Sequence, residues 1–93
     1  MEQNDQKRVI WETATEEKFQ KIIGGIPDMI RGIAETRVSK CAEQIVRNDN
    51  RTEITEKDMV DAFFKETPFG FHGPMKTDMT AVGVDYVKYG YPK

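Results

Sequence analysis

Residues 26–46 read IPDMIRGIAETRVSKCAEQIV, and this stretch decides the fold. Pro27 suits the first turn of a helix because its missing N–H would have no partner there, and Asp28 favours the positive end of the helix dipole. The pattern predicts a long amphipathic helix that reaches about Arg47. At about 100° per residue, its apolar residues share one side: Ile30, Ile33, Ala34, Val38, Cys41, Ala42 and Ile45.

A shorter helix, from about Ala14 to Ile23, is predicted before this central one. Thr13 and Glu16 fit a capping box at its start, and Gly24-Gly25 supplies a left-handed stop at its end. We expect Trp11 to fold back onto its apolar face. Three residues with i, i+3, i+4 spacing form that face: Phe19, Ile22 and Ile23.

A third helix is predicted from about Glu56 to Lys65. The turn-forming residues 48–51 precede it, and Thr55 with Asp58 forms a second capping-box pattern. Phe64 should lie on its flank. Its expected buried residues are Met59, Val60, Ala62 and Phe63.

After the third helix the chain becomes rich in glycine, proline and aromatic residues, with little regular period. We expect a disordered N-terminus over residues 1–8, a helical domain over 9–66, and an aromatic tail over 67–93 that packs on the domain or binds a partner. The predicted fold class is therefore all-α: a three-helix domain with a long central helix and a Gly/Pro/aromatic C-terminal tail.

The composition excludes several functional classes. The 93 residues allow one small domain, and a net charge of −2 does not attract nucleic acid or anionic lipid, so a nucleic-acid partner is not expected. Without an apolar run or a signal peptide, we expect a cytoplasmic protein with no membrane contact. The single cysteine, Cys41, excludes an internal disulfide and a metal site built from thiolates alone, so we expect no cofactor bound by this chain alone.

Four short motifs follow one another along the first two thirds of the chain. They are Trp11-Glu12-Thr13, Ile26-Pro27 with Ile30-Arg31-Gly32, Cys41-Ala42-Glu43, and Glu53-Ile54-Thr55. In their order and spacing they resemble the small helical domain at the C-terminus of the B subunit of light-independent protochlorophyllide reductase. The similarity covers about Val9 to Phe64.

The resemblance implies an accessory role in a nitrogenase-like redox complex, whose clusters and most substrate contacts belong to larger domains. An oxidoreductase subunit is then the expected protein partner, and contact with a tetrapyrrole follows from the resemblance only. Residues 67–93 lie outside the similarity.

Arg31 is the first candidate contact residue, because it interrupts the apolar side of the central helix. Its guanidinium can pair with Glu35 or with carbonyls at a helix end, or it can face an anionic group on a partner or ligand. Gly32 costs about 1 kcal/mol in a helix interior, which suggests that another backbone approaches closely there.

Two other polar residues, Arg37 and Cys41, can each belong to a functional site or have only a structural role. Arg37 shares a stripe with Lys40 and Arg47 that could bind phosphates, although Glu43 and Arg47 at i, i+4 spacing favour a solvated, ion-paired face. We expect Cys41 to be a small core residue rather than a reactive or metal-binding thiol.

The tail contributes the remaining candidates, His72, Phe69 and Phe71. The lone histidine is either a loop residue or a site, and the phenylalanines either complete a small core or anchor a partner.

No nucleophile–base pair or carboxylate pair is recognisable, so no catalytic residue and no metal ligand is predicted. The leading hypothesis is a non-catalytic accessory or interaction domain. The alternative is a histone-like nucleic-acid-binding protein, because a long helix followed by a short helix entered through Glu53-Ile54-Thr55 also resembles half of a histone fold. A third hypothesis is an enzyme that uses Arg31 and His72 on a small anion.

Overall fold

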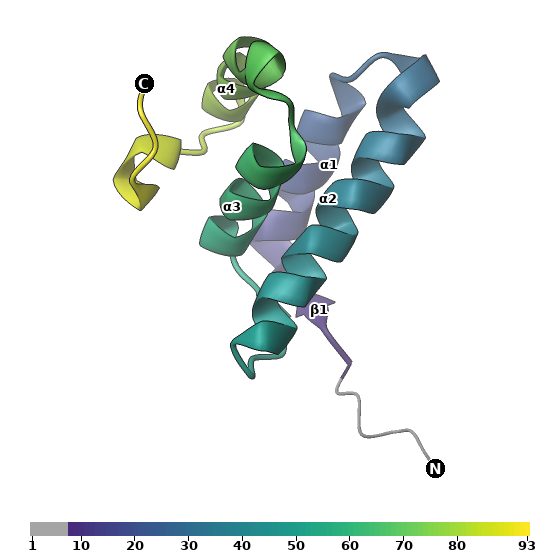
Figure 1. The fold of residues 1–93 in the computed structure, drawn as a ribbon, viewed down its shortest axis with the longest axis vertical. Coiled ribbons are helices and arrows are strands. Elements are labelled where there is room, and N and C mark those ends of the chain that lie inside the picture. Colours follow the sequence, from purple (N-terminus) through teal and green to yellow (C-terminus); the bar gives the residue numbers. More distant parts are fainter. Residues whose placement is uncertain (1–7) are drawn as a thin grey trace.

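The computed structural model describes residues 8–93, and within them the protein is mainly helical (Figure 1). The all-α prediction is confirmed. In chain order the elements are β1 (Ile10–Trp11), α1 (Thr13–Gly24), α2 (Asp28–Asn48), β2 (Glu53–Ile54), α3 (Glu56–Glu66), the 3-10 helix η1 (Phe69–Phe71), α4 (His72–Ala81) and the 3-10 helix η2 (Tyr86–Tyr89). Residues 1–7, most of the segment predicted to be disordered, lie outside the described residues.

The two short strands connect the starts of α1 and α3. They pair in parallel, with Ile10 opposite Glu53 and Trp11 opposite Ile54. The N–H of Ile10 donates to the Thr52 carbonyl at 2.9 Å. Because each strand leads directly into a helix, this pairing brings together the starts of two helices that are far apart in sequence.

The core lies between α1, α2 and α3, and α2 packs most extensively against α3. Trp11 stacks on Phe19 with ring centroids 4.5 Å apart, which confirms that it folds back onto α1. All four residues predicted to be buried on α3 are buried, and Phe64 is half-buried on the flank. The tail adds four further core residues: Met75, Met79, Val84 and Tyr86.

The start of α3 is the capping box that the sequence predicts. The Thr55 N–H donates to Asp58 Oδ2 at 2.9 Å. Arg51 adds two donors to the same carboxylate, at 2.9 and 2.6 Å. Asp58 is only 3% exposed, and burial alone would raise its pKa. The hydrogen bonds from Arg51 and Thr55 outweigh this burial and hold the pKa below its usual value.

The bounds of α1 lie within one residue of the prediction, but the signals predicted at both of its ends are wrong. The helix begins one residue earlier, with Glu12 as the N-cap residue, and the Thr15 hydroxyl donates to Glu12 Oε1 at 2.6 Å. The Thr13–Glu16 capping box is therefore not formed at the predicted position. Gly25 has φ −84°, so the helix ends without the left-handed residue that the Gly-Gly pair suggested.

The tail contains a fourth helix, α4, which the sequence analysis did not predict. Pro74 lies in the first turn of α4. The N–H groups of a first turn make no hydrogen bond within the helix, so the N–H that proline lacks is not needed there. Met75 and Met79, four residues apart, are both buried. The end of the tail returns to α3, where the Tyr91 ring stacks on Phe64 at 3.9 Å.

Two hydroxyl groups hold the end of the tail on α3. The Tyr91 hydroxyl donates to Asp61 at 2.5 Å, and the Tyr89 hydroxyl donates to Glu56 at 2.9 Å. Burial and the nearby carboxylates raise the pKa of each tyrosine to about 12. Within residues 8–93, no helix combines the length and the apolar character needed to cross a bilayer.

Candidate partner-binding surface

The N-terminal half of α2 exposes large apolar side chains. Met29 is 93% exposed, Ile30 52% and Ile33 60%. The predicted assignment of Ile30 and Ile33 to the buried side of this helix is therefore wrong. Ala42 is fully buried. It follows Ile33 by nine positions, which amounts to a rotation of roughly 180° about the helix axis, so the two side chains lie on opposite sides.

The buried side of α2 is narrower than the apolar pattern suggested. It is centred on three residues spaced by four, Val38, Ala42 and Val46. Cys41 and Ile45 are half-buried at its edge. The apolar residues of the N-terminal half thus form a second surface that no part of the described chain covers.

Arg37 and Lys40 continue this exposed surface toward the C-terminal half of α2. Both side chains are exposed. Together with Ile30 and Ile33 they fall within roughly 80° of each other around the helix axis. We call this set the α2 outer face: Met29, Ile30, Ile33, Arg37 and Lys40.

A groove lies beside the α2 outer face, between α2 and the end of α3. It has a volume of about 340 Å³ and is open to solvent. Three of its side chains are cationic, and one, Glu66, is anionic. Among residues 8–93, no ion pair involves any of the three cations, whereas Arg47 pairs with Glu43 at 3.5 Å as predicted. The lining residues are Arg37, Lys40, Cys41, Gln44, Ile45, Asn48, Lys65 and Glu66.

Cys41 lines this groove and is half-buried. Burial raises the pKa of its thiol, and the negative charge of Glu66 raises it further. A raised pKa lowers the thiolate fraction at neutral pH, so this environment does not activate the cysteine as a nucleophile.

Arg31 closes the turn between α1 and α2. Its guanidinium donates to the Ile26 carbonyl at 3.1 and 2.9 Å and to the Gly24 carbonyl at 3.4 Å. It also pairs with Asp28 at 2.7 Å. Of the two local alternatives, the bonds to helix-end carbonyls are confirmed and the pairing with Glu35 is wrong, because these contacts occupy the guanidinium.

Gly32 does not mark a close approach of two helices. A Cβ built on Gly32 would meet nothing within 4 Å. The interpretation that another backbone approaches there is therefore wrong, and the residue lies on open helix surface.

The tail candidates separate into a structural residue and an exposed pair. His72 begins α4, where its Nε2 lies 2.9 Å from the Thr67 carbonyl and its ring meets Phe64 edge-on at 5.1 Å. The interpretation of His72 as a loop residue is wrong. Phe69 is 87% exposed and Phe71 63%, so neither phenylalanine completes the core.

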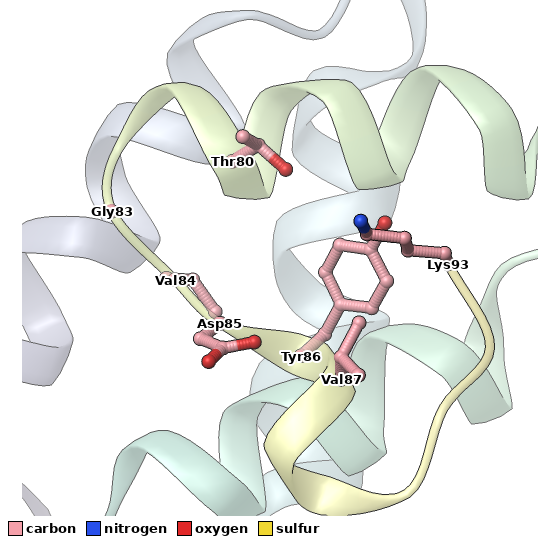
Figure 2. A pocket seen from close by; sticks show the side chains of 7 residues that line it. All are labelled: Thr80, Gly83, Val84, Asp85, Tyr86, Val87 and Lys93. Atoms are coloured by element: carbon pink, nitrogen blue, oxygen red, sulfur yellow. The ribbon is translucent and has the colours of Figure 1, made fainter.

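A second hollow, of about 360 Å³, lies between α4 and the end of the chain (Figure 2). Figure 2 shows the Tyr86 ring at its centre, with Lys93 beside the ring and Thr80 above it on α4. Its lining includes the ionisable side chains Asp85, Tyr86 and Lys93 but no histidine or cysteine. Among residues 8–93, no three His, Cys, Asp or Glu side chains are grouped so that they could hold a metal ion.

Comparisons with known proteins give no further guide to the site. No family model matches the chain, and no curated protein and no solved structure shows significant similarity to it.

Proposed function

We propose that this chain is a non-catalytic interaction module that docks another protein on the α2 outer face. The observation that carries the proposal is the exposure of three large apolar side chains, Met29, Ile30 and Ile33, on one side of one helix. Single exposed apolar residues are common, but a contiguous group on a regular element is typical of an interaction site.

Arg31 and His72, the two residues of the enzyme hypothesis, both make hydrogen bonds to backbone carbonyls that join neighbouring elements. Each therefore has a structural role that does not need a substrate.

We further propose that the partner is a subunit of a redox complex of the nitrogenase-like type. This step depends on the resemblance of residues 9–64 to the accessory domain of light-independent protochlorophyllide reductase. In such a complex the module would also lie close to a tetrapyrrole, which would be bound mainly by the larger subunits.

Affinity capture from the native host tests the docking surface. The wild type should recover a specific protein, and Ile33→Ser should lose it. Ile10→Ser is the matched control, because Ile10 is 53% exposed on β1 and Ile33 is 60% exposed on α2. Equal recovery by the two variants would refute docking on this face.

The redox assignment has its own test. Mass spectrometry of the captured protein should identify an oxidoreductase subunit, and the captured complex should show tetrapyrrole absorbance. Capture of an unrelated protein with no such absorbance would remove the redox assignment while leaving the docking surface in place.

Histone-like nucleic-acid binding remains the alternative. The cations of the groove favour it, whereas the neighbouring apolar residues and the net charge of −2 do not. A salt-dependent gel shift would support it, and the absence of a shift at about 50 μM protein and low ionic strength would count against it.

A further inference from the structure

We infer that the α2 outer face, taken with the groove beside it, receives an acidic amphipathic helix of the partner. This inference rests on the proposed docking function and adds the chemistry of the partner. The occupant would place apolar side chains on Ile30 and Ile33 and carboxylates beside Arg37, Lys40 and Lys65.

The local charge favours an acidic occupant. Three cations and one carboxylate line the groove, a local charge of +2 on a chain whose net charge is −2. The rest of the chain must therefore carry a net charge of −4. The groove is thus a positively charged site on a negatively charged protein. Exposed charges without partners are favourable contacts for an opposite charge on a partner, and they also steer its approach.

The same charges argue against a second copy of this chain as the occupant. A two-fold symmetric dimer brings the same patch of both copies together. Here that would place Arg37 and Lys40 of one copy near the same cations of the other. The two Glu66 carboxylates cannot balance six cations across such an interface.

The shape of the surface favours a helix over a flat contact. Its apolar and cationic residues follow one side of α2 from Met29 to Lys40, a length of about 16 Å at 1.5 Å per residue. The groove continues this line between α2 and α3. An amphipathic helix that lies in a groove uses apolar anchors at i, i+3, i+4 and i+7, which matches a surface of this length and width.

Two synthetic peptides test the inference with the full chain. Both have about 18 residues, with leucines spaced to form one helical face. One carries glutamates on the flanks of this face and the other carries lysines at the same positions. Fluorescence anisotropy should show binding of the glutamate peptide, at least tenfold tighter than any binding of the lysine peptide. Its affinity should fall as NaCl rises from about 50 to 500 mM, because salt screens exposed charges.

Variants locate the binding on the surface. We expect Ile33→Ser and Arg37→Glu each to weaken binding of the glutamate peptide by fivefold or more. Ile10→Ser and Lys21→Glu are the matched controls and should leave it unchanged, because Ile10 lies on β1 and Lys21 on α1. Thermal unfolding followed by circular dichroism verifies that all four variants are folded.

Four outcomes would overturn the inference. The first is equal binding of the two peptides, and the second is no binding at about 1 mM, which is the upper limit of weak specific affinity. The third is concentration-dependent self-association that Ile33→Ser abolishes. The fourth is a control variant that weakens peptide binding as much as its test variant does.

Failure of this inference can be told apart from failure of the docking function. If affinity capture from the host depends on Ile33 but is unaffected by Arg37→Glu, the partner is not acidic and only the inference fails. If capture is also independent of Ile33, the docking function itself fails.

Discussion

Replacing Asp58 by alanine should destabilise the protein by about 3 kcal/mol. The loss of the N-cap interaction with Thr55 contributes about 1 kcal/mol, and the loss of charged hydrogen bonds from Arg51 contributes about 2 kcal/mol. We take values from the lower half of the usual ranges because Arg51 is 36% exposed and retains Asp49 as a second partner. For a chain of this size the expected fall in Tm is about 15 °C.

Urea unfolding of the wild type and the variant, followed by Trp11 fluorescence, measures the difference directly. Trp11 is a suitable probe because it stacks on Phe19 in the core. The control is Glu43→Ala, which removes a surface ion pair with Arg47 and should cost less than about 0.5 kcal/mol.

The pH dependence tests the ionic part of the argument. Because folding lowers the pKa of Asp58, its ionic contribution is complete above the unfolded pKa of about 3.9 and is lost as pH falls through the folded pKa. The stability difference between wild type and Asp58→Ala should therefore be full at neutral pH and shrink below about pH 4. A difference under about 1 kcal/mol at pH 7, or one that stays constant at low pH, would show that the ionised Asp58 does not stabilise the fold through Arg51 and Thr55.

Three other perturbations test separate parts of the structure. Gly32→Ala should stabilise the protein by about 1 kcal/mol in urea unfolding, because the added methyl meets open space and removes a helix-interior glycine; destabilisation would mean that the site is occupied. Met79→Ala should lower the free energy of unfolding by about 3 kcal/mol and Met29→Ala by less than about 0.5 kcal/mol, because Met79 is fully buried and Met29 is 93% exposed. Equal losses would show that α4 is not part of the core. Tyr89 and Tyr91 should ionise near pH 12 in a titration followed by ultraviolet absorbance, and Tyr91→Phe should remove one of these ionisations. Because folding raises the pKa of Tyr91, the stabilisation from its hydroxyl should be present below about pH 10 and disappear as pH approaches 12, and titration of both groups near pH 10 would contradict the packed tail.

Local sequence patterns predicted the ends of α2 and α3 well, and they predicted the buried side of a helix where its apolar face is also the face that packs on the core. The observed α2 and α3 begin and end within about one residue of the prediction, since proline, the capping box and the polar turn at 48–51 act through the backbone nearby. The buried residues of α3 were also predicted correctly because its apolar residues form a single face.

The side of α2 that faces solvent could not be predicted in the same way. Apolar periodicity records which residues share a side of a helix, but it does not distinguish a side covered by the same chain from one that is uncovered. Ile30 and Ile33 therefore appeared to be core residues. A four-residue spacing does not separate Ile30 from the core either, because Ile30 lies in the same series, 30, 34, 38, 42 and 46, as the buried residues.

The helix α4 and the groove were missed for different physical reasons. Gly73-Pro74 looks like a helix breaker, and only its position in the first turn makes it compatible with a helix. Lys65 and Arg37 belong to different helices, so their meeting in one groove depends on the packing of α2 against α3. No local pattern carries that information.

Site-specific photo-crosslinking in the native host tests whether a partner docks on the α2 outer face. A photoreactive residue replaces Ile33 in one variant and Ile10 in another, two positions of similar exposure on different elements. We expect one discrete crosslinked partner from position 33, with an acidic amphipathic segment at the crosslink, and none from position 10. No crosslink from position 33, or the same products from both positions, would contradict it.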